Sequence, residues 1–158
     1  HTMGHICYVL TCSDGNEIVK RAVFTGDCLF VGGVGRFFEG TATDMYPSLL
    51  KLASLDDDTL IYCGHEYTQS NYKFALSVDG KNMDLINASN NANEKRANDQ
   101  PTIPSTIGQE KKTNLFLKCC DNSNVFITSN PTAHTECIDC NDPIAVLAYI
   151  RQLKNTFR

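Results

Sequence analysis

The sequence lacks the features that would indicate a membrane, fibrous or nucleic-acid-binding protein. Its 158 residues contain no apolar run near the roughly 20 residues that a membrane-spanning helix needs. Basic residues are not in excess, since 14 Lys and Arg stand against 18 Asp and Glu, which argues against a general nucleic-acid binder. With 10 Gly and 5 Pro, a collagen-like chain is also excluded. We therefore expect neither a membrane nor a nucleic-acid partner.

Cysteine is too scarce for a small disulfide-stabilised scaffold. The eight cysteines are about 5% of the chain, below the density of domains that depend on disulfide bonds. No signal peptide is visible in the first residues. We therefore expect reduced thiols and a cytoplasmic location, and we leave a mitochondrial or other organellar location open.

The residues that are present give the composition of an ordinary globular chain. Hydrophobic residues make up 42% and charged residues 20%, and the length suits one compact core with at most a small appendage. Acidic residues outnumber basic ones in residues 1–66, whereas basic residues slightly outnumber acidic ones in residues 67–158. An acidic front part suits cations, and a mildly basic remainder suits an anionic ligand.

Strand patterns are concentrated in the first part of the sequence. Residues 6–10 and 17–24 are rich in strand-forming residues and enclose a turn signal at residues 13–16, which predicts a β-hairpin. Short apolar runs at residues 29–31 and 59–63 predict two further strands.

Helix patterns dominate the remainder of the chain. Helical spacing is found at residues 41–54 and 68–78, and the Asn-rich residues 82–98, which are poor in apolar side chains, are predicted to form an exposed helix. The last helix is predicted to start with Asp142 as its N-cap and Pro143 as its first residue. Residues 119–141 look like a polar surface insertion. The order strand, helix, strand favours a layered α/β unit followed by helices.

Three good metal ligands lie where strands are predicted to begin or end. His5 precedes the first strand, Asp27 follows the second, and His65 follows the strand at residues 59–63. A rigid sheet can orient such side chains, and imidazole with carboxylate suits zinc, iron or manganese. Taken singly, each is more often a hydrogen-bonded core or turn residue, and spacing alone does not show that they converge.

Six short stretches carry a resemblance to a known family. They are HTMGHI (residues 1–6), FTGDCLFVGG (24–33), GRFFEGTA (35–42), YCGHEYT (62–68), PTIPST (101–106) and RQLK (151–154). The first two resemble the metallo-β-lactamase superfamily, and the next two narrow the resemblance to glyoxalase II, the hydroxyacylglutathione hydrolases. The last two resemble the helical C-terminal domain of that family. A persulfide dioxygenase with one iron, from the same superfamily, is less similar around residues 64–68.

The resemblance implies a fold and a reaction. The implied fold is α/β, with residues 1–67 forming the C-terminal half of a metallo-β-lactamase αββα sandwich and residues 68–158 forming a helical glutathione-binding domain. The family hydrolyses S-lactoylglutathione, a 2-hydroxyacylglutathione thioester, to glutathione and a 2-hydroxy acid through a metal-bound hydroxide. The implied cofactor is a pair of zinc ions, or of iron or manganese, in each intact active site.

The same resemblance implies a partial set of metal ligands. His5 is then a ligand of the first metal, Asp27 bridges both metals, and His65 is a ligand of the second, whereas His1 matches a position that is not a ligand. The His-x-His-x-Asp-His motif of the family occurs nowhere in this sequence. Because a catalytic zinc needs about three protein ligands by itself, the ligands present are too few for two metals.

We therefore expect the chain to be the C-terminal portion of a glyoxalase II that is inactive by itself, with its metals absent or incompletely held. A sheet without its upstream strands exposes apolar surface, which favours a homodimer. The alternative function is a non-catalytic glutathione-binding or interaction module that has lost the metal site.

The resemblance also implies where the glutathione thioester, the expected partner, is held. The corresponding positions are Arg36, Phe38, Tyr67, Arg151 and Lys154. Arg151 and Lys154 stand three residues apart, so they share one helix face and can meet glutathione carboxylates. The ordinary alternative for these two is a solvated helix end, where cations are favourable in any case.

A group of sulfur and imidazole side chains lies outside this pattern. It consists of Cys119, Cys120, His134, Cys137 and Cys140, and it includes one Cys-x-x-Cys pair. Such a group could form a small zinc site. Because Cys119 and Cys120 are adjacent, which is not a ligand spacing, surface thiols are the preferred interpretation.

Overall fold

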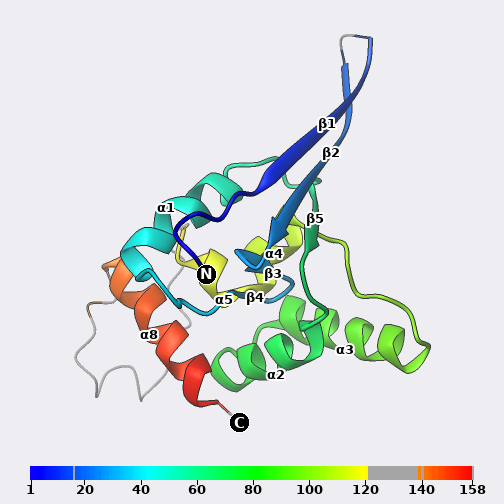
Figure 1. The fold of residues 1–158 in the computed structure, drawn as a ribbon. Coiled ribbons are helices and arrows are strands. Elements are labelled where there is room, and N and C mark those ends of the chain that lie inside the picture. The colour runs from blue at the N-terminus through cyan, green and yellow to red at the C-terminus, as the bar shows by residue number, and fades with distance from the viewer. Residues whose placement is uncertain (16, 121–138, 140, 158) are drawn as a thin grey trace.

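The computed structural model describes residues 1–15, 17–120, 139 and 141–157, and its described part is a mixed α/β fold with a helical C-terminal part (Figure 1). The strands are β1 (Tyr8–Asp14), β2 (Glu17–Gly26), β3 (Leu29–Phe30), β4 (Gly33–Val34), β5 (Leu60–Cys63) and β6 (Ser105–Thr106). The helices are α1 (Ala42–Ala53), α2 (Thr68–Val78), α3 (Met83–Ala97), α4 (Ile107–Thr113), α5 (Leu115–Lys118) and α8 (Pro143–Thr156). No described helix combines the length and apolar character needed to cross a bilayer.

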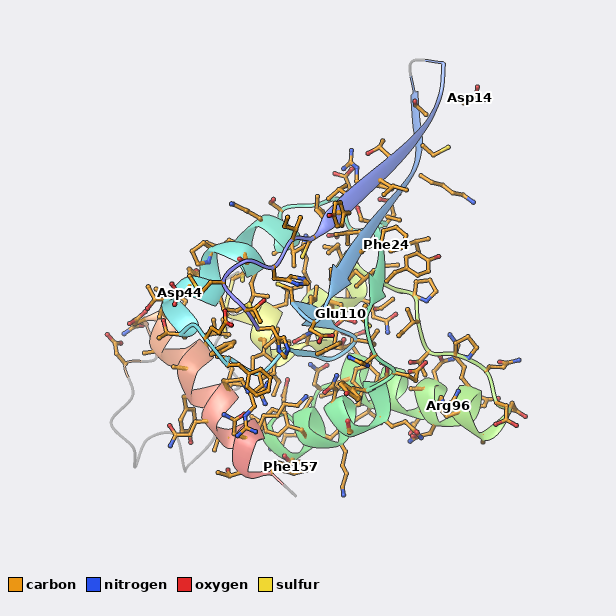
Figure 2. The ribbon with its side chains drawn as sticks, in the orientation of Figure 1. Asp14, Phe24, Asp44, Arg96, Glu110 and Phe157 are labelled. Carbon is orange, nitrogen blue, oxygen red and sulfur yellow. The ribbon has the colours of Figure 1, made fainter. Side chains whose placement is uncertain are left out.

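One four-stranded sheet organises the first part of the chain. Its order is β1-β2-β5-β6, with β2 and β5 parallel and the other neighbouring pairs antiparallel. The predicted hairpin is confirmed as β1 and β2, with Gly15 in the turn at a φ of +63° that favours glycine. The hairpin extends away from the helices, and Asp14 lies near its tip (Figures 1 and 2).

Most of the helices form where the sequence predicts them. Helix α2 spans the predicted residues, and α1 starts after Thr41, whose backbone N–H donates to the carboxylate of Asp44 at 2.8 Å. Helix α8 starts as predicted, because Asp142 Oδ1 accepts the N–H of Ile144 at 2.9 Å and Pro143 occupies the first turn. These helix starts therefore follow from local capping chemistry.

The elements between Ser105 and Lys118 are absent from the sequence prediction. Strand β6 has only two residues, and it exists because Ser105 and Thr106 pair with β5. Helices α4 and α5 are short and adjacent, and their N-caps are the side chains of Thr106 and Asn114. Such short elements depend on tertiary partners rather than on local periodicity.

A single cluster of buried side chains joins the sheet to the helices. It includes Val23 and Ile61 from the sheet and Phe74, Phe116 and Ile150 from the helices. The predicted division between residues 1–67 and 68–158 stays a prediction.

The interpretation of the cysteines at the end of α5 as surface thiols is wrong for Cys119. Cys119 is fully buried in the core, and its Sγ lies 3.4 Å from the carbonyl oxygen of Leu115. Cys120 is half-buried and packs against the core. The other members of the predicted zinc group, His134, Cys137 and Cys140, lie outside the described residues.

Candidate metal and anion site

The carboxylate of Asp27 lies between two imidazoles. Asp27 follows β2, His1 lies on the segment before β1, and His65 follows β5. His65 Nε2 is 3.4 Å from Asp27 Oδ1, and His1 Nε2 is 3.6 Å from Asp27 Oδ2. Each carboxylate oxygen therefore faces one imidazole nitrogen, and all three groups remain partly open to solvent.

The hydrogen bond of His1 to the backbone fixes the tautomer of its neutral ring. Its Nδ1 is 3.1 Å from the carbonyl oxygen of Arg36. Because a carbonyl only accepts, Nδ1 must donate, and in the neutral ring Nε2 then presents a lone pair. The Nε2 lone pair and the carboxylate oxygen repel each other when nothing lies between them. A cation between the two groups would be attracted to both and would make this arrangement favourable. Backbone partners of this kind orient metal-binding histidines.

Glycine is required where His65 approaches Asp27. A Cβ atom on Gly64 would lie 2.7 Å from Asp27 Oδ1, closer than real contacts allow. The Gly64 N–H donates to the Gly26 carbonyl oxygen at 2.8 Å, which fixes the end of β5 beside the Asp27 turn. The ring of His65 stacks on Tyr67, with ring centroids 5.0 Å apart.

The structure does not bring His5 to this carboxylate. The Nε2 atom of His5 donates to the carbonyl oxygen of Thr25 at 2.9 Å. Of the three predicted ligands, Asp27 and His65 lie together, while His5 is held elsewhere by the backbone. His1, which the sequence analysis left out, lies in the position expected for His5.

The donor chemistry at Asp27 fits a divalent metal only in part. Two imidazoles and a carboxylate are typical zinc ligands. Among the described residues, however, no group of three or more His, Cys, Asp or Glu side chains is arranged to hold a metal ion. These residues therefore fit part of a metal site and would need ligands from another segment to complete it.

A group of three cations lies next to this site. Arg36 is exposed, whereas Arg151 is only 7% exposed and donates from Nη1 to the Val34 carbonyl oxygen at 3.0 Å. The Lys154 amine donates to Asn71 Oδ1 and lies 5.5 Å from the centre of the Phe74 ring. Arg151 and Lys154 are thus not a solvated helix end.

The three charges are close enough to affect one another. Burial and, secondarily, the charge of Arg36 lower the pKa of Arg151 to about 10. Burial and the charge of Arg151 lower the pKa of Lys154 to about 7. Within the described ranges, none of the three is in an ion pair with an acidic side chain. Such a group of uncompensated cations suits an anionic ligand.

The lowered pKa of Lys154 leads to a pH prediction. Between about pH 7 and the ordinary lysine value of 10.5, the unfolded chain holds a proton that the folded chain has released. The free energy of unfolding should therefore rise with pH across this range, by up to about 1 kcal/mol per pH unit more than in Lys154→Met. Urea titrations of both proteins at several pH values measure this difference, and parallel pH profiles would contradict it.

Side chains from helices α2, α4 and α8 and from Asn114, the N-cap of α5, hold the loop between Asp27 and Arg36, which contains β3 and β4. Glu110 is fully buried, and its Oε2 accepts the Gly32 N–H at 2.8 Å and Asn114 Nδ2 at 2.9 Å. Asn114 Nδ2 also reaches the carbonyl oxygens of Phe30 and Gly33 at 3.2 and 3.1 Å.

Two more side chains complete this support. Asn71 Nδ2 donates to the Val31 carbonyl oxygen at 2.8 Å, and Arg151 binds Val34. Figure 2 shows Glu110 near the centre of the molecule, between the sheet and the helices. The helical part of the chain therefore fixes the loop that links Asp27 to Arg36.

The remaining predicted substrate residues are aromatic neighbours of the imidazoles. Phe38 is 65% exposed and meets the His1 ring edge-on, with centroids 4.8 Å apart. Tyr67 is 49% exposed and lies between His65 and Phe30. Both residues are therefore available to a ligand that approaches Asp27.

A carboxylate flanked by imidazoles at strand ends, beside a group of cations, suits a metal ion and an anionic ligand. The sequence profile described as "Hydroxyacylglutathione hydrolase C-terminus" matches residues 66–157. The chain belongs to the hydroxyacylglutathione hydrolase family.

Comparison with curated relatives gives the same family over the whole chain. The chain is 42% identical over 158 residues to "Hydroxyacylglutathione hydrolase" of Nitrosomonas eutropha, covering 100% of this chain and 57% of that protein. It is 41% identical over 158 residues to "Probable hydroxyacylglutathione hydrolase" of Schistosoma mansoni, covering 99% and 61%. It is 42% identical over 163 residues to "Hydroxyacylglutathione hydrolase" of Dictyostelium discoideum, covering 99% and 59%. The chain thus spans a little more than half the length of the relatives it matches.

Proposed function

We propose that this chain supplies part of the active site of a hydroxyacylglutathione hydrolase, which cleaves S-lactoylglutathione and related 2-hydroxyacylglutathione thioesters. The observation that carries the proposal is the Asp27 carboxylate with one imidazole nitrogen facing each of its oxygens. A carboxylate that faces two ligands in this way suits a bridge between two metal ions.

The proposed ligands within this chain are His1, Asp27 and His65. They replace the set His5, Asp27 and His65, because the Nε2 atom of His5 is engaged by Thr25. Zinc, iron or manganese would activate water and polarise the thioester carbonyl when bound. The residues of this chain orient the proposed ligands. The backbone carbonyl of Arg36 holds the His1 ring, and the absence of a side chain on Gly64 allows His65 to approach Asp27.

The remaining ligands would come from the part of the relatives that this chain does not span. Strand β1 has a free edge within the described sheet, and its side chains are exposed. Beside it lies a cavity of about 520 Å³ lined by apolar side chains that include Ile6, Val9 and Leu52. We propose that upstream strands complete an αββα sandwich here, and that in their absence a second copy of the chain pairs at this edge.

The glutathione part of the substrate would bind at the cations. Arg36 is exposed and can meet a glutathione carboxylate directly, with Phe38 and Tyr67 bordering the thioester. Arg151 and Lys154 lie deeper, where they add positive charge and hold the loop that carries Arg36. The uncompensated charges of Arg36 and Arg151 favour the anionic tripeptide, and Lys154 adds to them below about pH 7.

Substitution of Arg36 tests this binding site. In an active protein, Arg36→Ala should raise KM for S-lactoylglutathione about tenfold, because a charge-assisted hydrogen bond contributes about 1.5–3 kcal/mol and 1.4 kcal/mol is a factor of ten. The value of kcat should change less, since this contact lies away from the carbonyl. Lys81→Ala, on the exposed turn before α3, is the matched control, and equal KM values for the two variants would contradict the assignment.

One observation favours the alternative, a non-catalytic glutathione-binding or interaction module. Within the described part of the chain no three ligands are arranged to hold a metal. In that case the cations would still bind glutathione, but no thioester would be cleaved.

A fusion protein that includes the upstream segment of a relative distinguishes between the two proposed functions. The 158-residue chain alone should hydrolyse S-lactoylglutathione negligibly, because its ligands are too few. The same chain joined to the upstream segment of the Nitrosomonas eutropha relative should bind metal and hydrolyse the thioester, and EDTA should remove the activity. Glutathione binding without turnover in the joined protein would support the module, and robust turnover by the 158-residue chain would contradict the incomplete site.

A further inference from the structure

Two cysteines from different parts of the chain meet at the carbonyl oxygen of Thr25. Cys7 precedes β1, and Cys28 lies between β2 and β3. The Cys28 N–H donates to the Thr25 oxygen at 2.9 Å, and the Cys7 thiol lies 3.8 Å from the same atom. Cys7 and Cys28 are therefore neighbours at this one carbonyl in the folded chain.

The two thiols differ in how easily a small molecule can reach them. Both line the cavity of about 520 Å³ beside α1. Cys28 is only 5% exposed, and its Sγ lies 3.9 Å from Met45 Sδ. Cys7 is half-buried, so it is the more accessible of the two thiols to an oxidant that enters the cavity.

We propose that Cys7 and Cys28 form a redox-active pair that closes to a disulfide when the protein meets a hydroperoxide. The Cys7 thiolate attacks the peroxide and becomes a sulfenic acid, and hydroxide leaves and takes up a proton to form water. The Cys28 sulfur then attacks the Cys7 sulfur, and a second water leaves. Overall the two thiols lose two electrons and two protons, and hydrogen peroxide is reduced to two molecules of water.

Their shared position at one carbonyl and in one cavity distinguishes this pair from the exposed thiol of Cys12. Cys12 lies on β1 and is the more accessible target for an oxidant. It stands opposite Lys20 in the β1–β2 register, with no cysteine beside it there. Exposure alone would therefore direct oxidation to Cys12, whereas a resolving partner directs stable disulfide formation to Cys7 and Cys28.

Peptide mapping of the 158-residue chain tests the proposal. The chain is treated with hydrogen peroxide, its remaining thiols are blocked with N-ethylmaleimide, and it is digested with trypsin without reduction. We expect a linked pair of the peptides 1–20 and 22–36. In Cys12→Ser, where Cys7 is the only thiol of its peptide, the link should form at an unchanged rate. It should be lost in Cys7→Ser and in both Cys28→Ser and Cys28→Ala.

A denatured control separates the folded contact from random pairing. In urea the link between Cys7 and Cys28 should form at least tenfold more slowly than in the folded chain, because the thiols are no longer held together. The closed bond also constrains the unfolded chain, so the oxidised protein should unfold at a higher temperature than the reduced one. Equal rates with and without urea, or oxidation of Cys12 while Cys7 and Cys28 stay reduced, would overturn the proposal.

Discussion

In an active fusion of this chain to the upstream segment of a relative, His1→Ala should lower kcat/KM for S-lactoylglutathione by about a thousandfold, whereas His5→Ala should retain most of the activity. The imidazole of His1 faces the Asp27 carboxylate with its Nε2 atom. Its loss would remove a metal ligand, and a metal contributes several kcal/mol to transition-state stabilisation, of which each 1.4 kcal/mol is a factor of ten in rate. His5 Nε2 binds a backbone carbonyl instead.

Metal analysis gives this comparison a second measurement. After dialysis, the His1→Ala protein should hold less metal per chain than the parent protein, and the His5→Ala protein should hold as much as the parent. Circular dichroism of both variants shows whether either has lost its fold. A large loss of metal and activity in the folded His5→Ala protein, with His1→Ala unaffected, would restore the ligand set implied by the sequence resemblance.

Glu110→Ala should lower the free energy of unfolding by about 3 kcal/mol or more. The substitution leaves the Gly32 N–H and Asn114 Nδ2 without the acceptor that they share in the core, and it removes the partner of Ser105 Oγ at 2.7 Å. Each buried polar group that loses its partner costs about 1–3 kcal/mol, and a domain has only about 5–15 kcal/mol in total. Urea titration followed by circular dichroism measures the loss.

Glu110→Gln is the matched control because it keeps the shape of the side chain and one acceptor oxygen. Burial raises the pKa of Glu110 above its ordinary value of 4.5, so the folded chain holds this proton to higher pH than the unfolded chain. Wild-type stability should therefore fall as pH rises from about 4.5 through the raised pKa, and the Gln variant should lack this contribution. Equal stability of Glu110→Ala and wild type would show that the loop does not depend on Glu110.

The sequence predicts much of the fold because its local signals are strong. The turn around Gly15 and the apolar patterns beside it specify the hairpin, and Asp142 with Pro143 specifies the start of α8. Strand β6 and helices α4 and α5 escape prediction because they are short, and β6 in particular is defined by its pairing with β5. The support of the loop after Asp27 also escapes it, because Asn71, Glu110 and Asn114 are far from that loop in the sequence.

In the site, too, some features follow from the sequence and others only from the tertiary structure. The sequence placed Asp27 and His65 at strand ends, and the parallel pairing of β2 with β5 in one sheet brings them together. His1 and His5 lie on one segment four residues apart, and the sequence offers two equivalent imidazoles. Only the path of the chain decides between them, since it turns His1 toward Asp27 and Arg36 and turns His5 toward Thr25.

By itself, the sequence determined the family, the order of the main elements and the residue types of the site, because capping, periodicity and short motifs are local properties. The tertiary structure decided which imidazole meets the carboxylate, that Arg151 is buried and Lys154 half-buried rather than solvated, and that Cys7 and Cys28 lie at one backbone carbonyl. Those outcomes depend on contacts between residues far apart in the chain, and such contacts exist only once the helices pack against the sheet and fix the loop between Asp27 and Arg36.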